Sequence, residues 1–110
     1  MRNGSDMLNV TLYFGLDRRE NVPVSEEEWA KFVKEEVTPA FPKGLTVTHG
    51  RGQYLAKSGT LYDEDTKVLH IIYDREPDSD DKIEHLRSSY MKKYDQESVL
   101  RVDHHSIASW

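Results

Sequence analysis

The chain has 110 residues, 36% of them hydrophobic and 32% charged, with a formal net charge of −5. This length predicts a single small domain, and the lack of a basic stripe disfavours nucleic-acid binding. The absence of cysteine excludes disulfides and thiolate zinc sites. No apolar run suits a membrane span or the core of a signal peptide, so we expect a cytoplasmic chain without membrane contact.

The chain begins with a polar, glycine-containing stretch, residues 1–8, which predicts a flexible lead-in. Residues 9–16 (NVTLYFGL) then alternate between apolar and polar side chains. Because neighbouring side chains of a strand point to opposite faces, this alternation predicts a half-buried β-strand.

A helix is predicted next. Ser25 and Glu28 form a capping box, and Val24 and Trp29 are placed as a hydrophobic staple around it. The apolar stripe that starts at Trp29 recurs at helical spacing. We expect the helix to end at Thr38-Pro39, because a residue before proline avoids the helical conformation.

The second half of the chain predicts two strands, a helix and a last strand. Residues 45–56 read as a strand that Gly50 and Gly52 interrupt, and residues 67–74 form the most apolar strand. Apolar residues at helical spacing predict a helix over residues 80–94. The chain closes with a strand in QESVLRVD, residues 96–103, and a tail.

This order, β-α-β-β-α-β, predicts a ferredoxin-like α+β fold over residues 9–110. Four antiparallel strands form one sheet, both helices lie on one of its faces, and the first and third strands are central. The other face is then open. It is predicted to be partly apolar and partly ionisable, and such a face is rarely left in water. We therefore expect a homodimer through the open sheet face.

The last strand is predicted to turn Leu100 and Val102 toward the core and Arg101 toward the open face. Tyr13, His70 and Arg101 then lie on three adjacent strands of that face. A tyrosine hydroxyl and an imidazole act as acids or bases, and a guanidinium holds an anion. The structural alternative is an ordinary cross-strand Glu–Arg ion pair beside a half-buried tyrosine.

A second candidate is HGRGQY, residues 49–54, where two glycines flank Arg51 and would let an anion approach the backbone. The alternative is a bent edge strand. His104 and His105 are adjacent and point to opposite faces, so they do not chelate one metal ion, and no motif implies a cofactor. The acidic run DEDT, residues 63–66, is interpreted as a solvated loop.

Several blocks resemble a family of small bacterial proteins known as domain of unknown function 3574. The blocks are LYFGL, PVSEEEWAKFVKEEVTPAFPKGLTV, GQY, KVLHIIY and QESVLRVD, in the family's order. The resemblance implies conserved family positions at Gln53, Glu97 and Arg101, which have no evident packing role. Typical members begin with an export signal, so the resemblance also implies an exported location as an alternative to the cytoplasm.

Together these features predict a protein that binds a small anionic organic molecule in a pocket of the open sheet face, with transformation of that molecule as an open alternative. The predicted ligand-binding residues are Arg51, Gln53 and Arg101, and the predicted catalytic residues are Tyr13, His70 and Glu97. The alternative is a non-catalytic protein-binding or regulatory module, such as a phage-type inhibitor, that uses the same face as an interface.

Overall fold

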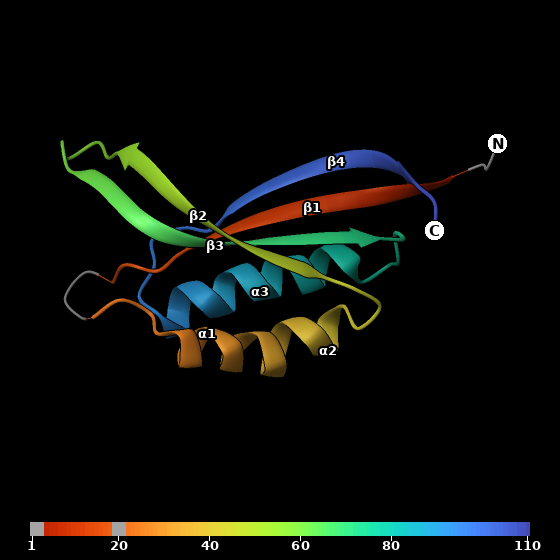
Figure 1. Cartoon of the computed structure of the whole chain (residues 1–110), viewed down its shortest axis with the longest axis horizontal. Helices are drawn as coiled ribbons and strands as arrows, with labels where there is room; N and C mark the ends of the chain where they lie inside the picture. The colour runs from red at the N-terminus through yellow and green to blue at the C-terminus, as the bar shows by residue number, and fades with distance from the viewer. Residues whose placement is uncertain (1–3, 19–21) are drawn as a thin grey trace.

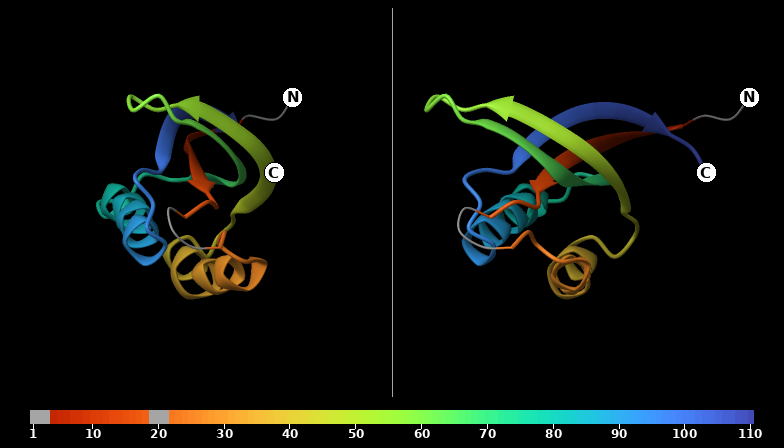
Figure 2. Two further views of the ribbon diagram at one scale, coloured as in Figure 1. Left: turned by 90° about the vertical axis from the view of Figure 1, so that its left-hand side faces the viewer. Right: turned by 60° about the vertical axis from the view of Figure 1, so that its left-hand side comes forward.

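The computed structural model describes residues 4–18 and 22–110. The elements, in chain order, are β1 (Ser5–Gly15), α1 (Glu26–Phe32), η1 (Val33–Val37), α2 (Thr38–Ala40), β2 (Thr46–Leu55), β3 (Leu61–Tyr73), α3 (Ser79–Lys93) and β4 (Leu100–Ala108). The strands form one antiparallel sheet in the order β2-β3-β1-β4, and the helices cover one face of it (Figures 1 and 2). The predicted ferredoxin-like α+β fold is confirmed.

The start of the first helix is as predicted. The Ser25 hydroxyl accepts the Glu28 N–H at 3.0 Å, and the Glu28 carboxylate accepts the Ser25 N–H at 3.1 Å. Val24 and Trp29 are both buried, as a hydrophobic staple requires.

The predicted end of that helix is wrong, because helical backbone continues through Pro39 to Ala40. The turn before the proline is a π-helix, in which the Thr38 N–H donates to the Val33 carbonyl five residues earlier. Proline has no N–H to donate, and its ring needs room in the preceding turn. The wider π-turn supplies that room.

The core centres on Phe14 of the central strand β1, which is fully buried. Its ring centroid lies 5.2 Å from that of Trp29, 5.6 Å from that of Phe32 and 4.7 Å from that of Tyr90. The Tyr90 hydroxyl also donates to the Gly15 carbonyl at 2.7 Å. Helices α1 and α3 therefore both pack against the end of β1 and fix its position.

The β2–β3 hairpin is longer than predicted. Its second strand starts at Leu61, whereas the sequence pattern starts it at residue 67. The pairing of β1 with β3 ends at Gly15 and Thr66, but β2 and β3 stay paired as far as Leu55 and Leu61. Figure 1 shows the hairpin projecting past the end of β1.

The two chain ends also carry more strand than predicted. Residues 5–8, which the sequence assigns to a flexible lead-in, belong to β1. They pair with the end of β4, where Ser5 lies opposite Ala108. His104 and His105, predicted to begin a solvated tail, are exposed residues within β4.

The predicted faces of β4 are exchanged. Val99 enters the core just before the strand begins and is only 1% exposed. Leu100 lies opposite Tyr13 on the open face and is 59% exposed, and Arg101 lies opposite the core residue Leu12. Because Val99 already takes the inward position, strand alternation turns Leu100 outward and Arg101 toward the helices.

Helix α3 ends in a Schellman motif. The Gln96 N–H donates to the Met91 carbonyl at 3.1 Å, and Asp95 takes the left-handed position with φ 51°. Glycine normally occupies this position, and a carboxylate at a helix C-terminus opposes the helix dipole. Asp95 is thus locally unfavourable for stability.

Substituting glycine for Asp95 is expected to raise the free energy of unfolding by about 0.5–1 kcal/mol, because it removes both costs. Urea denaturation of the ligand-free protein measures the change. Asp74→Gly is the control, because Asp74 is an exposed loop residue without a positive φ and should show no gain. A lower unfolding free energy in Asp95→Gly would contradict this interpretation.

Candidate ligand-binding cleft

A cleft of about 730 Å³ lies at the end of the open sheet face. The projecting hairpin forms one wall, and the loop between α3 and β4, residues 95–98, forms the other. The sheet residues Tyr13, Gly15, Glu64 and Leu100 form its floor.

Glu64 is the half-buried carboxylate of this floor. Its Oε2 accepts the backbone N–H of Asp17 at 2.7 Å. A Cβ at Gly15 would lie 2.5 Å from Oε1, so only glycine lets the carboxylate lie over this part of β1. Burial raises the pKa of Glu64, and no described Lys, Arg or His forms an ion pair with it.

The cleft is acidic. Four carboxylates line it, those of Asp17, Glu64, Asp95 and Glu97, and Arg18 is the one described cation among the lining residues. The Arg18 guanidinium is already paired, because its Nη2 donates to the Glu28 carboxylate at 2.8 Å. Among the described lining residues, carboxylates therefore outnumber cations, which favours a positively charged guest.

The hairpin wall carries two stacked aromatic rings. Tyr54 and Tyr62 are cross-strand partners, with ring centroids 4.9 Å apart and planes only 15° from parallel. Burial and the negative charge of Glu97 raise the pKa of the Tyr54 hydroxyl. The negative charge of Glu97, on the loop wall, therefore affects the Tyr54 hydroxyl on the hairpin wall.

The loop wall is tied to the end of β1 by Gln96. Its Nε2 donates to the carbonyl oxygen of Asp17 and, at 3.4 Å, to that of Tyr94. These bonds hold residues 95–98 beside Asp17, whose backbone N–H donates to Glu64.

Three predicted site residues line the cleft: Tyr13, Gln53 and Glu97. The Gln53 side chain, however, is hydrogen-bonded to Asp63, which also binds Arg51. Sequence reasoning missed Glu64 and Tyr62, because the DEDT run was interpreted as a loop. LYDEDT does not alternate between apolar and polar side chains, so the sequence holds no direct signal that Tyr62 and Glu64 share one face of a strand.

His70 and Arg51 lie elsewhere. His70 is on the open face as predicted, but it lies outside the cleft and its Nε2 is 3.1 Å from the Thr48 hydroxyl. Arg51 points away from the cleft, donating to Asp63 at 2.7 Å and to Asp65 at 3.3 Å. The alternative of a structural edge strand describes Arg51 better than an anion site does.

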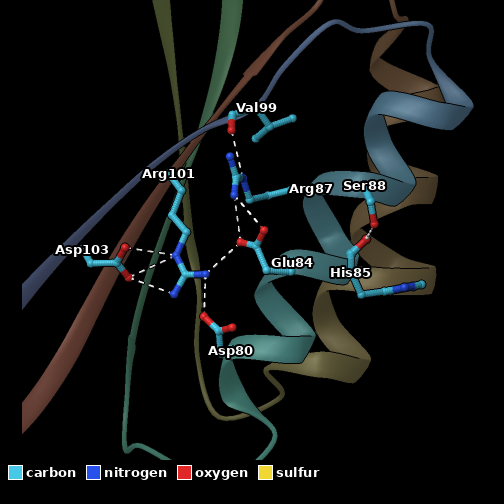
Figure 3. Close-up of polar contacts among 8 residues, drawn as sticks. All are labelled: Asp80, Glu84, His85, Arg87, Ser88, Val99, Arg101 and Asp103. Carbon is cyan, nitrogen blue, oxygen red and sulfur yellow. Dashed lines mark hydrogen bonds and ion pairs between the residues drawn. The ribbon is translucent and has the colours of Figure 1, made fainter.

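Arg101 lies on the helix side of the sheet, which corrects its predicted place on the open face. Figure 3 shows its guanidinium between β4 and α3. Its Nη1 donates to Asp80 and Glu84, both at 2.8 Å, and its Nε donates to Asp103 at 3.0 Å. Burial alone would lower the pKa of Arg101, but the hydrogen bonds that its guanidinium donates to Asp103, Glu84 and Asp80 outweigh burial and raise that pKa.

Arg87 strengthens the same connection. Its Nε donates to the Val99 carbonyl at 2.9 Å, and its Nη1 donates to Glu84 at 2.8 Å. Two guanidinium groups therefore hold the start of β4 to α3 (Figure 3). Neither Arg51 nor Arg101 lines the cleft, and both form ion pairs with carboxylates.

Over residues 4–18 and 22–110, no three His, Asp or Glu side chains are grouped so that they could hold a metal ion. In the same part of the chain, no helix is both long and apolar enough to cross a membrane.

A family model described as "Protein of unknown function (DUF3574)" matches residues 9–110. The chain belongs to this family. The match confirms the resemblance carried by the sequence blocks and covers the whole of the described domain except its first residues. Comparison with the curated proteins finds no match for this DUF3574 chain.

Solved structures share the fold of the DUF3574 chain. A phage SAM lyase in complex with S-methyl-5′-thioadenosine is 18% identical, with a TM-score of 0.72 over 100% of this chain and 96% of that one. The apo form of a phage SAM lyase is 19% identical, with a TM-score of 0.69 over the same shares of both chains. CutA from Synechococcus elongatus is 11% identical, with a TM-score of 0.61 over 98% of this chain and 83% of that one.

Proposed function

We propose that the cleft binds a small organic cation of the SAM (S-adenosylmethionine) type. The observation that carries this proposal is Glu64, a half-buried carboxylate in an acidic cleft with no cationic partner among the described residues. A carboxylate held out of water is stabilised by a positive charge placed beside it. The cleft therefore favours a cation over the anion that the sequence pattern suggested.

The chemistry of a sulfonium suits this cleft. A sulfonium carries a permanent positive charge but has no N–H or O–H to donate. It is held by carboxylates and by the faces of aromatic rings, which attract cations. Glu64 supplies the first kind of group, and Tyr13, Tyr54 and Tyr62 supply the second.

The shared fold supports SAM as the ligand to test. The likeness to the phage SAM lyase extends over all of this chain and nearly all of the lyase chain. At this identity it supports the choice of ligand only through the fold, and the acidic cleft is the independent argument.

Isothermal titration of SAM and of S-adenosylhomocysteine into the protein tests the proposal. The two compounds differ by one methyl group and the positive charge on sulfur. We expect SAM to bind about 10-fold more tightly or better, because only SAM places a positively charged sulfur beside the cleft carboxylates. Equal affinities, or no binding of SAM, would refute the proposal.

The same mixtures report on catalysis. Chromatography of the incubated SAM sample reveals any S-methyl-5′-thioadenosine that forms. Its appearance at a rate above the protein-free sample would extend the proposal from binding to SAM cleavage.

The homodimer and the protein-binding module stay predictions. The open face carries the exposed apolar side chains of Ile72 and Leu100, which either arrangement would cover. Light scattering after size-exclusion chromatography measures the mass in solution, and a monomer at all concentrations would contradict the dimer.

A further inference from the structure

We propose that the stacked Tyr54–Tyr62 pair is the platform for a planar base, so that the cleft selects a nucleoside sulfonium over simpler organic cations. This inference rests on the proposed function and adds the part of the ligand that the hairpin recognises.

The tyrosine pair differs from the aromatic rings of the core in ring geometry and in exposure. The core rings around Phe14 meet at tilted or edge-on angles, whereas Tyr54 and Tyr62 lie nearly parallel. Tyr54 is 46% exposed, and neither ring belongs to the buried core. An exposed parallel pair offers an outer ring face on which a third flat ring can stack.

The hairpin keeps the space beside the pair open. Gly52 is the cross-strand partner of Glu64, so the position next to Tyr54 on this face of β2 carries no side chain. Gly52 and both tyrosines line the cleft. A ring on the platform would thus have free space between itself and the Glu64 carboxylate.

The spacing along β3 matches a nucleoside sulfonium. Tyr62 and Glu64 are two residues apart on one face of the strand, which separates their side chains by roughly 7 Å along the sheet. In SAM the ribose holds the adenine ring and the sulfonium apart by a comparable length. One ligand can therefore stack on the hairpin and present its charge to Glu64.

The binding of two adenosine compounds to tyrosine variants tests this inference. SAM carries both the adenine base and the positive charge on sulfur, whereas S-methyl-5′-thioadenosine carries the adenine base without that charge. Tyr54→Ala and Tyr62→Ala are expected to weaken the binding of both compounds by about 10-fold or more, because stacking of the base does not depend on the sulfonium. Tyr54→Phe keeps the ring and should bind both compounds as the wild type does.

Leu55→Ala is the matched control. Leu55 lies at the hairpin tip, is 70% exposed and does not line the cleft. Its substitution should leave both affinities unchanged. Circular dichroism and thermal melting verify the fold of each variant, and Tyr54→Leu replaces Tyr54→Ala if the alanine variant does not fold.

The outcomes separate this inference from the proposed function. If both tyrosine variants bind SAM and S-methyl-5′-thioadenosine as the wild type does, the platform is wrong while cation binding stands. If the tyrosine variants no longer bind S-methyl-5′-thioadenosine, but the wild type binds SAM no better than S-adenosylhomocysteine, the tyrosine pair is a base platform and the cation proposal fails. If the wild type binds neither compound, both are overturned.

Discussion

Replacing Glu64 with glutamine is expected to weaken SAM binding by about 10- to 100-fold at neutral pH. Glutamine keeps the shape of the side chain and an oxygen that can accept the Asp17 N–H, but it removes the negative charge. Binding of S-methyl-5′-thioadenosine, which is uncharged at sulfur, should change by less than about 2-fold. Isothermal titration of both compounds measures the two effects.

The pH dependence of binding follows from the same carboxylate. Burial raises the pKa of Glu64 above its ordinary value of 4.5, so Glu64 takes up a proton at a higher pH than an exposed glutamate does. The affinity of the wild type for SAM should fall as the pH is lowered through this raised pKa. The Glu64→Gln variant should lack this component of the pH dependence.

Stability provides the internal check on Glu64→Gln. A raised pKa in the folded state means that Glu64 contributes stability at low pH, and that this contribution is lost as the pH rises through the folded pKa. At neutral pH the variant should therefore be no less stable than the wild type. Glu35→Gln, an exposed change on η1, is the control for both binding and stability. A Glu64→Gln variant that is clearly destabilised, or that binds SAM normally, would contradict the role given to Glu64.

Replacing Arg101 with alanine is expected to lower the free energy of unfolding by about 1–3 kcal/mol, because it breaks hydrogen bonds to three carboxylates. The Arg101 side chain is 17% exposed, but its partners are about half exposed or more, which keeps the loss moderate. Urea denaturation measures the change. SAM affinity of the folded variant should stay within about 2-fold of the wild type, since Arg101 lies outside the cleft.

Arg51→Ala is the matched control for Arg101→Ala. Arg51 also pairs with carboxylates, but its side chain is 59% exposed on the projecting hairpin, so its loss should cost less than about 1 kcal/mol. If Arg101→Ala is as stable as Arg51→Ala, the link between β4 and α3 is not structural. If instead Arg101→Ala abolishes SAM binding without loss of stability, the original assignment of Arg101 to a ligand site is restored.

The sequence was sufficient for the fold because local signals and the global arrangement agree. Alternation around Phe14 defines the central strand, the Ser25 capping box starts the first helix, and an apolar stripe defines α3. Each signal acts over a few residues, and the β-α-β-β-α-β order leaves few topologies.

The faces of β4 could not be predicted from alternation alone. Val99, Leu100 and Val102 are all apolar, so either set of alternate residues could point inward. Contacts far apart in the sequence decide the register: Val99 fills the core before the strand begins, and Arg101 meets Asp80 and Glu84 on α3. The acidic pair at Asp80 and Glu84, one helical turn apart, was the available hint of an inward-facing arginine.

Only some of the residues that line the cleft could be predicted, because the others also depend on contacts far apart in the sequence. Tyr13, Gln53 and Glu97 were identified, but Glu64 looked like one carboxylate of a solvated acidic run. Its burial depends on the hairpin continuing past β1 and on Gly15 leaving room for its carboxylate. Neither condition is visible in the run DEDT itself.

The most direct test of the account is a titration of the ¹⁵N-labelled protein with SAM, followed by two-dimensional NMR of the backbone amides. If the cleft binds SAM, the largest shift changes should fall on Gly15, Asp17, Gly52, Glu64 and Gln96, around the floor and both walls. Changes that cluster around Arg101 and Asp80, or around His70 and Ile72, would place the ligand elsewhere and contradict the account. A spectrum that does not change with SAM would do the same.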